Sequence, residues 1–125
     1  MKRILLIEDN LEIRENTAEI LELEGYEVTT AVNGKIGFEL ARNNPPDLIL
    51  CDILMPEMTG YEVFEHLKMN VDTSSIPFIF ITASAEKSEV QLGLNMGAAG
   101  YVRKPFEEKE LLDAVGECLR RNSAE

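Results

Sequence analysis

Short, continuous runs of apolar residues alternate with longer segments of helical spacing along the whole of this 125-residue chain. The runs are rich in Ile, Leu, Val and Phe, and most contain no polar residue, which is typical of strands that are buried on both faces. They lie at residues 4–7, 28–32, 48–51, 78–81 and 101–102. Because strands that are separated by helices run parallel, this alternation restricts the chain to an α/β architecture.

The segments that follow these runs predict five helices. The first covers residues 11–24, with Asn10 as its N-cap and Gly25 as its C-terminal stop. The others are predicted at residues 35–43, 61–69, 86–96 and 107–121. Right-handed crossovers place the helices on both faces of the sheet. We therefore expect one doubly wound (βα)5 domain, a flavodoxin-like five-stranded parallel sheet in the order 2-1-3-4-5.

Polar side chains that can bind ions or take part in reactions follow four of the five apolar runs. Glu8 and Asp9 follow the first run, Asp52 the third, Thr82 the fourth, and Lys104 the fifth. In an open parallel sheet, ligands bind outside the carboxyl ends of the strands, near the point where strand order reverses. The predicted fold therefore gathers three carboxylates, a hydroxyl and an ammonium at one edge of the sheet.

Three neighbouring carboxylates repel one another, so each resists ionisation unless a cation joins them. Mg²⁺ fits best, since it binds one or two carboxylates together with waters and a substrate phosphate. Lys104 adds a positive charge and Thr82 a hydroxyl donor for phosphate oxygens. Asp52 is then a candidate nucleophile that forms an acyl phosphate.

Each of these residues, taken alone, has an ordinary structural interpretation. Acidic residues such as Glu8 and Asp9 favour the start of a helix, and Asp52 suits a turn. Thr82 suits a helix cap, and Lys104 is by itself a typical surface lysine. The functional interpretation depends on all five lying at the carboxyl ends of predicted core strands.

At these residues the chain closely resembles the receiver domain of response regulators in two-component signalling, over essentially all 125 positions. The matching motifs are Glu8-Asp9, Asp52-x-x-Met55-Pro56-x-x-x-Gly60, Thr82-Ala83 and Gly97-Ala98-x-x-Tyr101-x-x-Lys104-Pro105-Phe106. The resemblance implies that this is a signalling phosphoacceptor rather than an enzyme, although one that assists its own phosphorylation and dephosphorylation.

The resemblance also implies the roles of the acidic residues. Asp52 is the expected phosphoacceptor. Asp9 and Asp52 are expected to bind Mg²⁺ directly, with the backbone carbonyl of Leu54 as a third ligand and Glu8 acting through water. No organic cofactor is implied.

The resemblance implies that the remaining motif residues bind the phosphoryl group and change conformation when it is present. Thr82 and Lys104 are expected to bind its oxygens, and the peptide bond before Pro105 is expected to be cis. Thr82 is also expected to couple to Tyr101 as a switch, which remodels the face built from the fourth helix, fifth strand and fifth helix.

The implied partners are a histidine kinase or a histidine phosphotransfer protein, and a downstream protein target that the sequence does not identify. The phosphodonor is expected to dock over the first helix and the loop at residues 105–106, with Asn10, Leu11 and Arg14 as contact candidates. The apolar Leu54 offers no side chain to position a water, so no specially fast self-dephosphorylation is expected. His66 is predicted to lie on the surface, away from the site.

Composition excludes some classes of function. The chain has 12 Lys and Arg residues against 23 Asp and Glu residues, a formal charge of −11, which argues against direct binding to nucleic acid or to an anionic membrane. No apolar run approaches the ~20 residues that span a bilayer. Cys51 and Cys118 form no disulfide framework, so a reduced, cytoplasmic protein is expected.

Three alternatives to a phosphorylated receiver fit the sequence less well. The first is a pseudo-receiver that works only through protein contact, which the intact set of five polar residues disfavours. The second is an aspartate-nucleophile phosphatase, which resembles Asp-x-Asp where this chain has Leu54 in the second position. The third is a flavin or nucleotide site, which the acidic loop at residues 8–10 would repel.

The domain pattern covers the whole sequence. We expect a single receiver domain at residues 1–125, with its core at about 2–121 and no output domain. A stand-alone receiver and a domain cut from a longer protein both fit this pattern.

Overall fold

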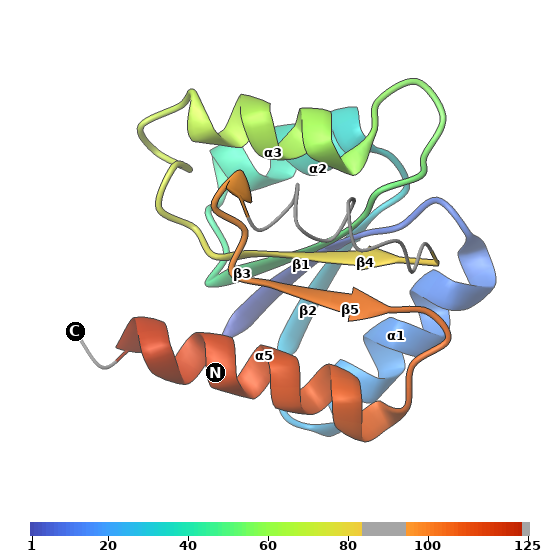
Figure 1. Ribbon diagram of the computed structural model, residues 1–125. Coiled ribbons are helices and arrows are strands. Elements are labelled where there is room, and N and C mark those ends of the chain that lie inside the picture. The colour runs from blue at the N-terminus through green and yellow to red at the C-terminus, as the bar shows by residue number, and fades with distance from the viewer. Residues whose placement is uncertain (84–94, 124–125) are drawn as a thin grey trace.

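Five parallel strands form one sheet in the order β2-β1-β3-β4-β5, as predicted. Figure 1 shows the computed structural model, in which residues 1–83 and 95–123 are described. The strands are β1 (Arg3–Ile7), β2 (Glu27–Ala31), β3 (Leu48–Asp52), β4 (Phe78–Thr82) and β5 (Gly100–Arg103). Each lies within two residues of its predicted position.

The described helices cover both faces of this sheet. They are α1 (Leu11–Leu23), α2 (Gly34–Asn43), α3 (Gly60–Lys68) and α5 (Glu108–Ser123). Helices α2 and α3 lie on one face, and α1 and α5 lie on the other (Figure 1). The helix predicted at residues 86–96 falls almost entirely on residues 84–94, which lie outside the described part of the chain.

Two apolar clusters, one on each face, explain why the strand sequences are continuously apolar. Leu5 and Ile7 of β1 join the cluster beneath α2 and α3, whereas Ile4 and Leu6 join the cluster beneath α1 and α5. Side chains alternate between the faces of a strand, so a strand that is covered on both faces needs apolar residues at every position. β2 is the exception, because it lies at an edge and exposes part of its length.

Capping residues set the helix boundaries near the site. The Asn10 side chain accepts a hydrogen bond from the Ile13 amide at 3.0 Å, which confirms the predicted N-cap of α1. Gly25, which follows the Glu24 C-cap, has φ of +101°, a backbone conformation that favours glycine. Thr59 and Glu62 form a capping box at the start of α3.

Among the described residues, no helix is both long and apolar enough to cross a membrane. Cys51 is buried in β3 and Cys118 is buried in α5, and neither forms a disulfide bond. Burial strongly raises the pKa of the Cys51 thiol and also raises the pKa of Cys118. Both cysteines are therefore parts of the core.

Candidate functional site

The three predicted carboxylates meet at the carboxyl ends of β1 and β3. These strands are neighbours, with Ile7 opposite Cys51, so Glu8 and Asp9 lie beside Asp52. One carboxylate oxygen from each of the three residues lies within 4.8 Å of the other two. The sequence prediction that this part of the fold gathers an acidic cluster is confirmed.

The cluster is buried on one side and open on the other. Glu8 is 1% exposed and Asp52 is 6% exposed, whereas Asp9 is exposed to solvent. Burial is the main reason that the pKa of Glu8 is raised to about 7, with the hydrogen bond from Lys104 lowering it and the charge of Asp52 raising it further. Glu8 and Asp52 thus form the closed side of the cluster, and the exposed Asp9 marks the side that a ligand can reach.

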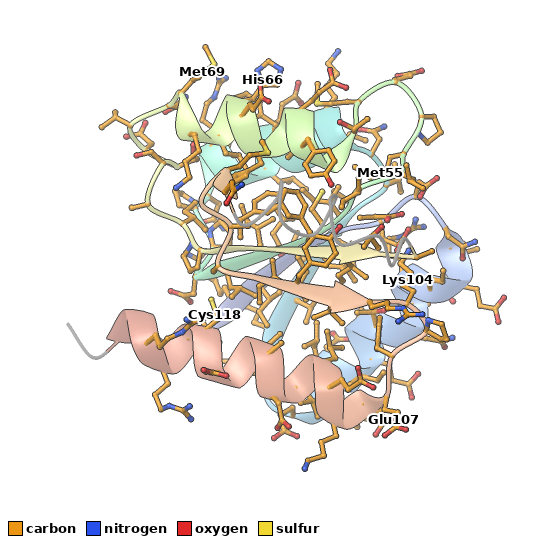
Figure 2. All side chains as sticks on the ribbon, viewed as in Figure 1. Met55, His66, Met69, Lys104, Glu107 and Cys118 are labelled. Carbon is orange, nitrogen blue, oxygen red and sulfur yellow. The ribbon has the colours of Figure 1, made fainter. Side chains whose placement is uncertain are left out.

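Lys104 supplies the positive charge at this cluster. Its Nζ lies 2.7 Å from Glu8 Oε1 and 3.3 Å from Asp52 Oδ2, and its backbone amide donates to the Thr82 carbonyl at 2.7 Å. Burial acts to lower the pKa of Lys104, but its hydrogen bond to Glu8 and the charges of Asp52 and Glu8 outweigh burial and raise it. Figure 2 shows Lys104 at the carboxyl end of β5. The Lys104–Pro105 peptide bond is cis, as the resemblance implied.

The loop between β1 and α1 is held by contacts to its side chains and to its carbonyls. Glu8 Oε2 accepts a hydrogen bond from the Asn10 amide at 3.3 Å. Arg14 Nη1 donates to the Glu8 carbonyl at 2.9 Å and lies 3.5 Å from the Asp9 carbonyl. The backbone that carries the acidic pair is thus fixed from the first turn of α1.

The turn after Asp52 packs closely against the start of α3. The Gly60 amide donates to the Ile53 carbonyl at 2.9 Å, and the Ile53 amide donates to the Ile81 carbonyl at 3.3 Å. A Cβ atom at Gly60 would collide with the Asp52 carbonyl and would lie 2.9 Å from Ile53 Cα. Only glycine fits there without moving this turn. The Leu54 side chain in the turn is 66% exposed and points no polar group at the site.

Thr82 and Tyr101 lie on neighbouring strands. Thr82 is the last residue of β4 and is fully buried, and Tyr101 lies in β5 opposite Phe80. The Tyr101 and Phe80 rings lie 6.1 Å apart, within the cluster beneath α2 and α3. Thr82 is two residues beyond Phe80, so it faces the same side of the sheet. Thr82 and Tyr101 therefore lie on the same face of neighbouring strands, and their coupled role stays a prediction.

His66 takes no part in the cluster. It is exposed on α3, its ring lies 5.9 Å from the Phe38 ring, and Figure 2 shows it far from Lys104. The predicted surface position is confirmed.

Sequence reasoning missed two contacts within the site. It assigned Lys104 to a phosphoryl group and did not foresee its ion pair with Glu8. It also considered Arg14 only as a docking candidate and not as a donor to the acidic loop. Two features of the sequence could have indicated these contacts. Three predicted carboxylates near one lysine favour an ion pair with Lys104, and an arginine one helical turn after the N-cap can reach back to the preceding loop.

The donor set suits a hard divalent cation. Within the described part of the chain, three carboxylates face the Lys104 ammonium, and the exposed Asp9 leaves a side that water and ligand can reach. Carboxylate, carbonyl and water oxygens are the ligands that Mg²⁺ takes in proteins. Glu8, Asp9 and Asp52 can therefore hold this ion.

Comparison with known proteins identifies the family. Residues 4–116 match the description "Response regulator receiver domain". The chain is 37% identical over 121 residues to the DNA-binding dual master transcriptional regulator RpaA of Synechocystis, and 35% identical over 121 residues to the response regulator SaeR of Staphylococcus aureus. Each match covers 97% of this chain but only 50% and 52% of those proteins, so the chain spans about half their length.

Solved structures agree in fold. A CheY-like response regulator receiver domain protein from Methanospirillum hungatei superposes with a TM-score of 0.91 at 33% identity, covering 99% of this chain and 98% of that one. The Vibrio cholerae chemotaxis protein CheY4 superposes with a TM-score of 0.89 at 30% identity, covering 94% of this chain and 98% of that one. With this fold, these relatives and the acidic edge of its sheet, the chain belongs to the response regulator receiver domains of two-component systems.

Proposed function

We propose that Asp52 accepts a phosphoryl group from a histidine kinase or a histidine phosphotransfer protein. The observation that carries this proposal is the position of Asp52 at the end of β3, with a carboxylate oxygen within 4.8 Å of those of Glu8 and Asp9 and with Oδ2 at 3.3 Å from the Lys104 ammonium. A carboxylate oxygen of Asp52 attacks the phosphorus of the donor's phosphohistidine. The new P–O bond forms an acyl phosphate while the P–N bond breaks, and the imidazole leaves with a proton from solvent.

Mg²⁺ is the proposed cofactor for this transfer. Asp9, Asp52 and the backbone carbonyl of Leu54 would bind it directly, with Glu8 acting through water. When bound, the ion neutralises negative charge on the phosphoryl oxygens and on the carboxylates that receive them. The close spacing of the three carboxylates supports this assignment.

Lys104 and Thr82 are proposed to hold the phosphoryl oxygens. The Lys104 ammonium already lies 3.3 Å from Asp52 Oδ2, so a phosphoryl group on that carboxylate falls within its reach. Thr82 lies at the end of the strand next to β3, where its hydroxyl can donate to a second oxygen.

Tyr101 is proposed to report the event to a downstream protein. Its ring packs beside Phe80, two residue pairs before Thr82 along the sheet. A shift of the Thr82 hydroxyl toward the phosphoryl group would change the space open to this ring. The response would appear on the face made by β5, α5 and the helix predicted at residues 86–96.

The phosphodonor protein is proposed to dock across α1 and the loop after β5. An open, mainly apolar groove beside Lys104 lies between these two elements, lined by Ile13, Asn16, Ile20, Ala83, Lys104, Pro105 and Phe106. Leu11, at the start of α1, is 58% exposed. A helix of the donor that fills the groove would bring its phosphohistidine to the open side of the acidic cluster.

Intact-mass measurement tests the central claim. The protein is incubated with Mg²⁺ and acetyl phosphate, and wild type is compared with Asp52→Asn and with Asp72→Asn, a matched change at an exposed loop position. We expect one added phosphoryl group on wild type and on Asp72→Asn, and none on Asp52→Asn. No gain on wild type, or equal gain at the same site on Asp52→Asn, would contradict the proposal and leave a phosphorylation-independent interaction module.

A further inference from the structure

Arg14 reaches back from the first turn of α1 to the loop that carries the acidic pair. One nitrogen of its guanidinium, Nη1, donates to the Glu8 carbonyl at 2.9 Å and lies 3.5 Å from the Asp9 carbonyl. The side chain is half-buried, and the Arg14 amide is itself bonded to the Asn10 carbonyl at 2.9 Å. The contact therefore joins a capped helix to two successive peptide units of the loop.

These two carbonyls belong to the two peptide units that flank the Asp9 Cα atom. Rotating either peptide unit about its bond to that atom moves the Asp9 side chain, so holding both units restricts where its carboxylate can lie. Asp9 is exposed, and the negative charges of Glu8 and Asp52 act to push it away when no cation is present. Its carboxylate nevertheless has an oxygen within 4.8 Å of those of the other two, and the hydrogen bond from Arg14 to the Glu8 carbonyl restrains the backbone next to it.

We propose that Arg14 is a positioning residue for the divalent cation site. It touches neither the cation nor the phosphoryl group. It fixes the backbone of Glu8 and Asp9 so that the three carboxylates are already gathered before the cation arrives. This inference rests on the proposed function, since it assumes that these carboxylates bind Mg²⁺.

The sign of the effect separates positioning from simple charge. Arg14 places a positive charge close to the cluster, and like charges repel, so loss of the charge alone would tighten Mg²⁺ binding. Loss of positioning would weaken it, because the carboxylates would then have to be gathered at the moment of binding. The two explanations predict opposite changes in the dissociation constant.

Titration calorimetry with Mg²⁺ alone tests the proposal on wild type, Arg14→Met and Arg120→Met. Arg120→Met is the matched control, because it removes the same charge from an exposed site in the last turn of α5. We expect Arg14→Met to bind Mg²⁺ about tenfold more weakly than wild type, and Arg120→Met to bind within about twofold of it. An unchanged or tighter dissociation constant for Arg14→Met would overturn the proposal.

Two further measurements keep this test specific. Thermal unfolding in chelator checks that Arg14→Met is folded. If it is not, Arg14→Lys, which keeps the charge but not the planar fork, takes its place with a dissociation constant expected between those of wild type and Arg14→Met. Raising the Mg²⁺ concentration should restore the lowered rate at which Arg14→Met gains a phosphoryl group from acetyl phosphate, and a loss of rate that saturating Mg²⁺ does not restore would contradict a purely positioning role. Absence of Mg²⁺ binding to wild type would instead defeat the proposed function itself.

Discussion

Lys104 lies closer to Glu8 than to Asp52, with its ammonium 2.7 Å from Glu8 Oε1 and 3.3 Å from Asp52 Oδ2. Glu8 is also the carboxylate whose pKa is raised to about 7. The shortest contact of the Lys104 ammonium is thus with Glu8, the most buried acid of the cluster, and its contact with Asp52, the proposed phosphoacceptor, is longer. The first two predictions follow from this arrangement.

Removal of the Glu8 charge is predicted to change how stability depends on pH. The pKa of Glu8 rises from an ordinary 4.5 to about 7 on folding. Its contribution to the free energy of unfolding is therefore fully present below pH 4.5 and is lost as the pH rises through 7. In chelator, the free energy of unfolding of Glu8→Gln relative to wild type should therefore grow by about 1–3 kcal/mol between pH 5 and pH 8. Urea unfolding at both pH values measures this. Glu22→Gln, an exposed position on α1, should show no such growth.

Removal of the Lys104 charge is predicted to separate metal binding from phosphorylation. In Lys104→Met the oxygens of Glu8 and Asp52 are released and a repelling positive charge is lost, so Mg²⁺ should bind about fivefold more tightly or better. Phosphorylation by acetyl phosphate should fall by about a hundredfold, because the proposed contact to the phosphoryl oxygens is gone. Lys109→Met, exposed in the first turn of α5, should change neither. Weaker Mg²⁺ binding by Lys104→Met would refute the competition between the two cations.

Substitution by alanine is predicted to change the stability of the protein in opposite directions at Gly60 and at Gly116. At Gly60 the new Cβ meets the backbone of Asp52 and Ile53, so Gly60→Ala should destabilise the fold by about 1–3 kcal/mol and lower Mg²⁺ affinity by moving the acceptor turn. At Gly116, within α5, the nearest neighbour is the Tyr26 hydroxyl at 4.0 Å, so Gly116→Ala should stabilise the protein by about 0.5–1 kcal/mol. Thermal unfolding and Mg²⁺ titration of the two variants measure both effects. A neutral Gly60→Ala would show that the turn can relax without loss.

Both thiols are predicted to be unreactive in the folded protein. Cys51 and Cys118 are fully buried, and burial raises the pKa of each, strongly for Cys51. Reaction with a thiol-specific chromogenic reagent at pH 8 should therefore be slow until denaturant is added, and should then consume both thiols. Rapid reaction of either thiol without denaturant would show local opening at that position.

The sequence predicted the fold well because the strands are covered on both faces. Runs such as Leu48 to Cys51 leave few other arrangements for a chain whose strands alternate with helices. Boundary errors arose where a polar residue extends an element. Asp52, for example, belongs to β3, because its backbone pairs with Ile81 of β4 even though its side chain serves the site.

The residues that form the candidate site could also be predicted from the sequence, but the contacts between them could not. The rule that ligands bind at the carboxyl ends of parallel strands placed Glu8, Asp52 and Lys104 together. Which carboxylate the ammonium contacts depends on differences in burial of the kind that separate Glu8 from Asp9, and a linear pattern carries no such information. Arg14 was missed for a related reason, because its partners are backbone carbonyls, which every residue has.

The ion pair between Glu8 and Lys104 joins residues 96 positions apart in the chain. Glu8 follows the first strand and Lys104 the last, and β3 and β4 must both stand between β1 and β5 before the two can meet. During synthesis, a chain that has not yet reached its final strand carries the acidic residues without their counter-ion. Because the proposed phosphoryl transfer uses Lys104, an incompletely synthesised chain would not accept a phosphoryl group until β5 has joined the sheet.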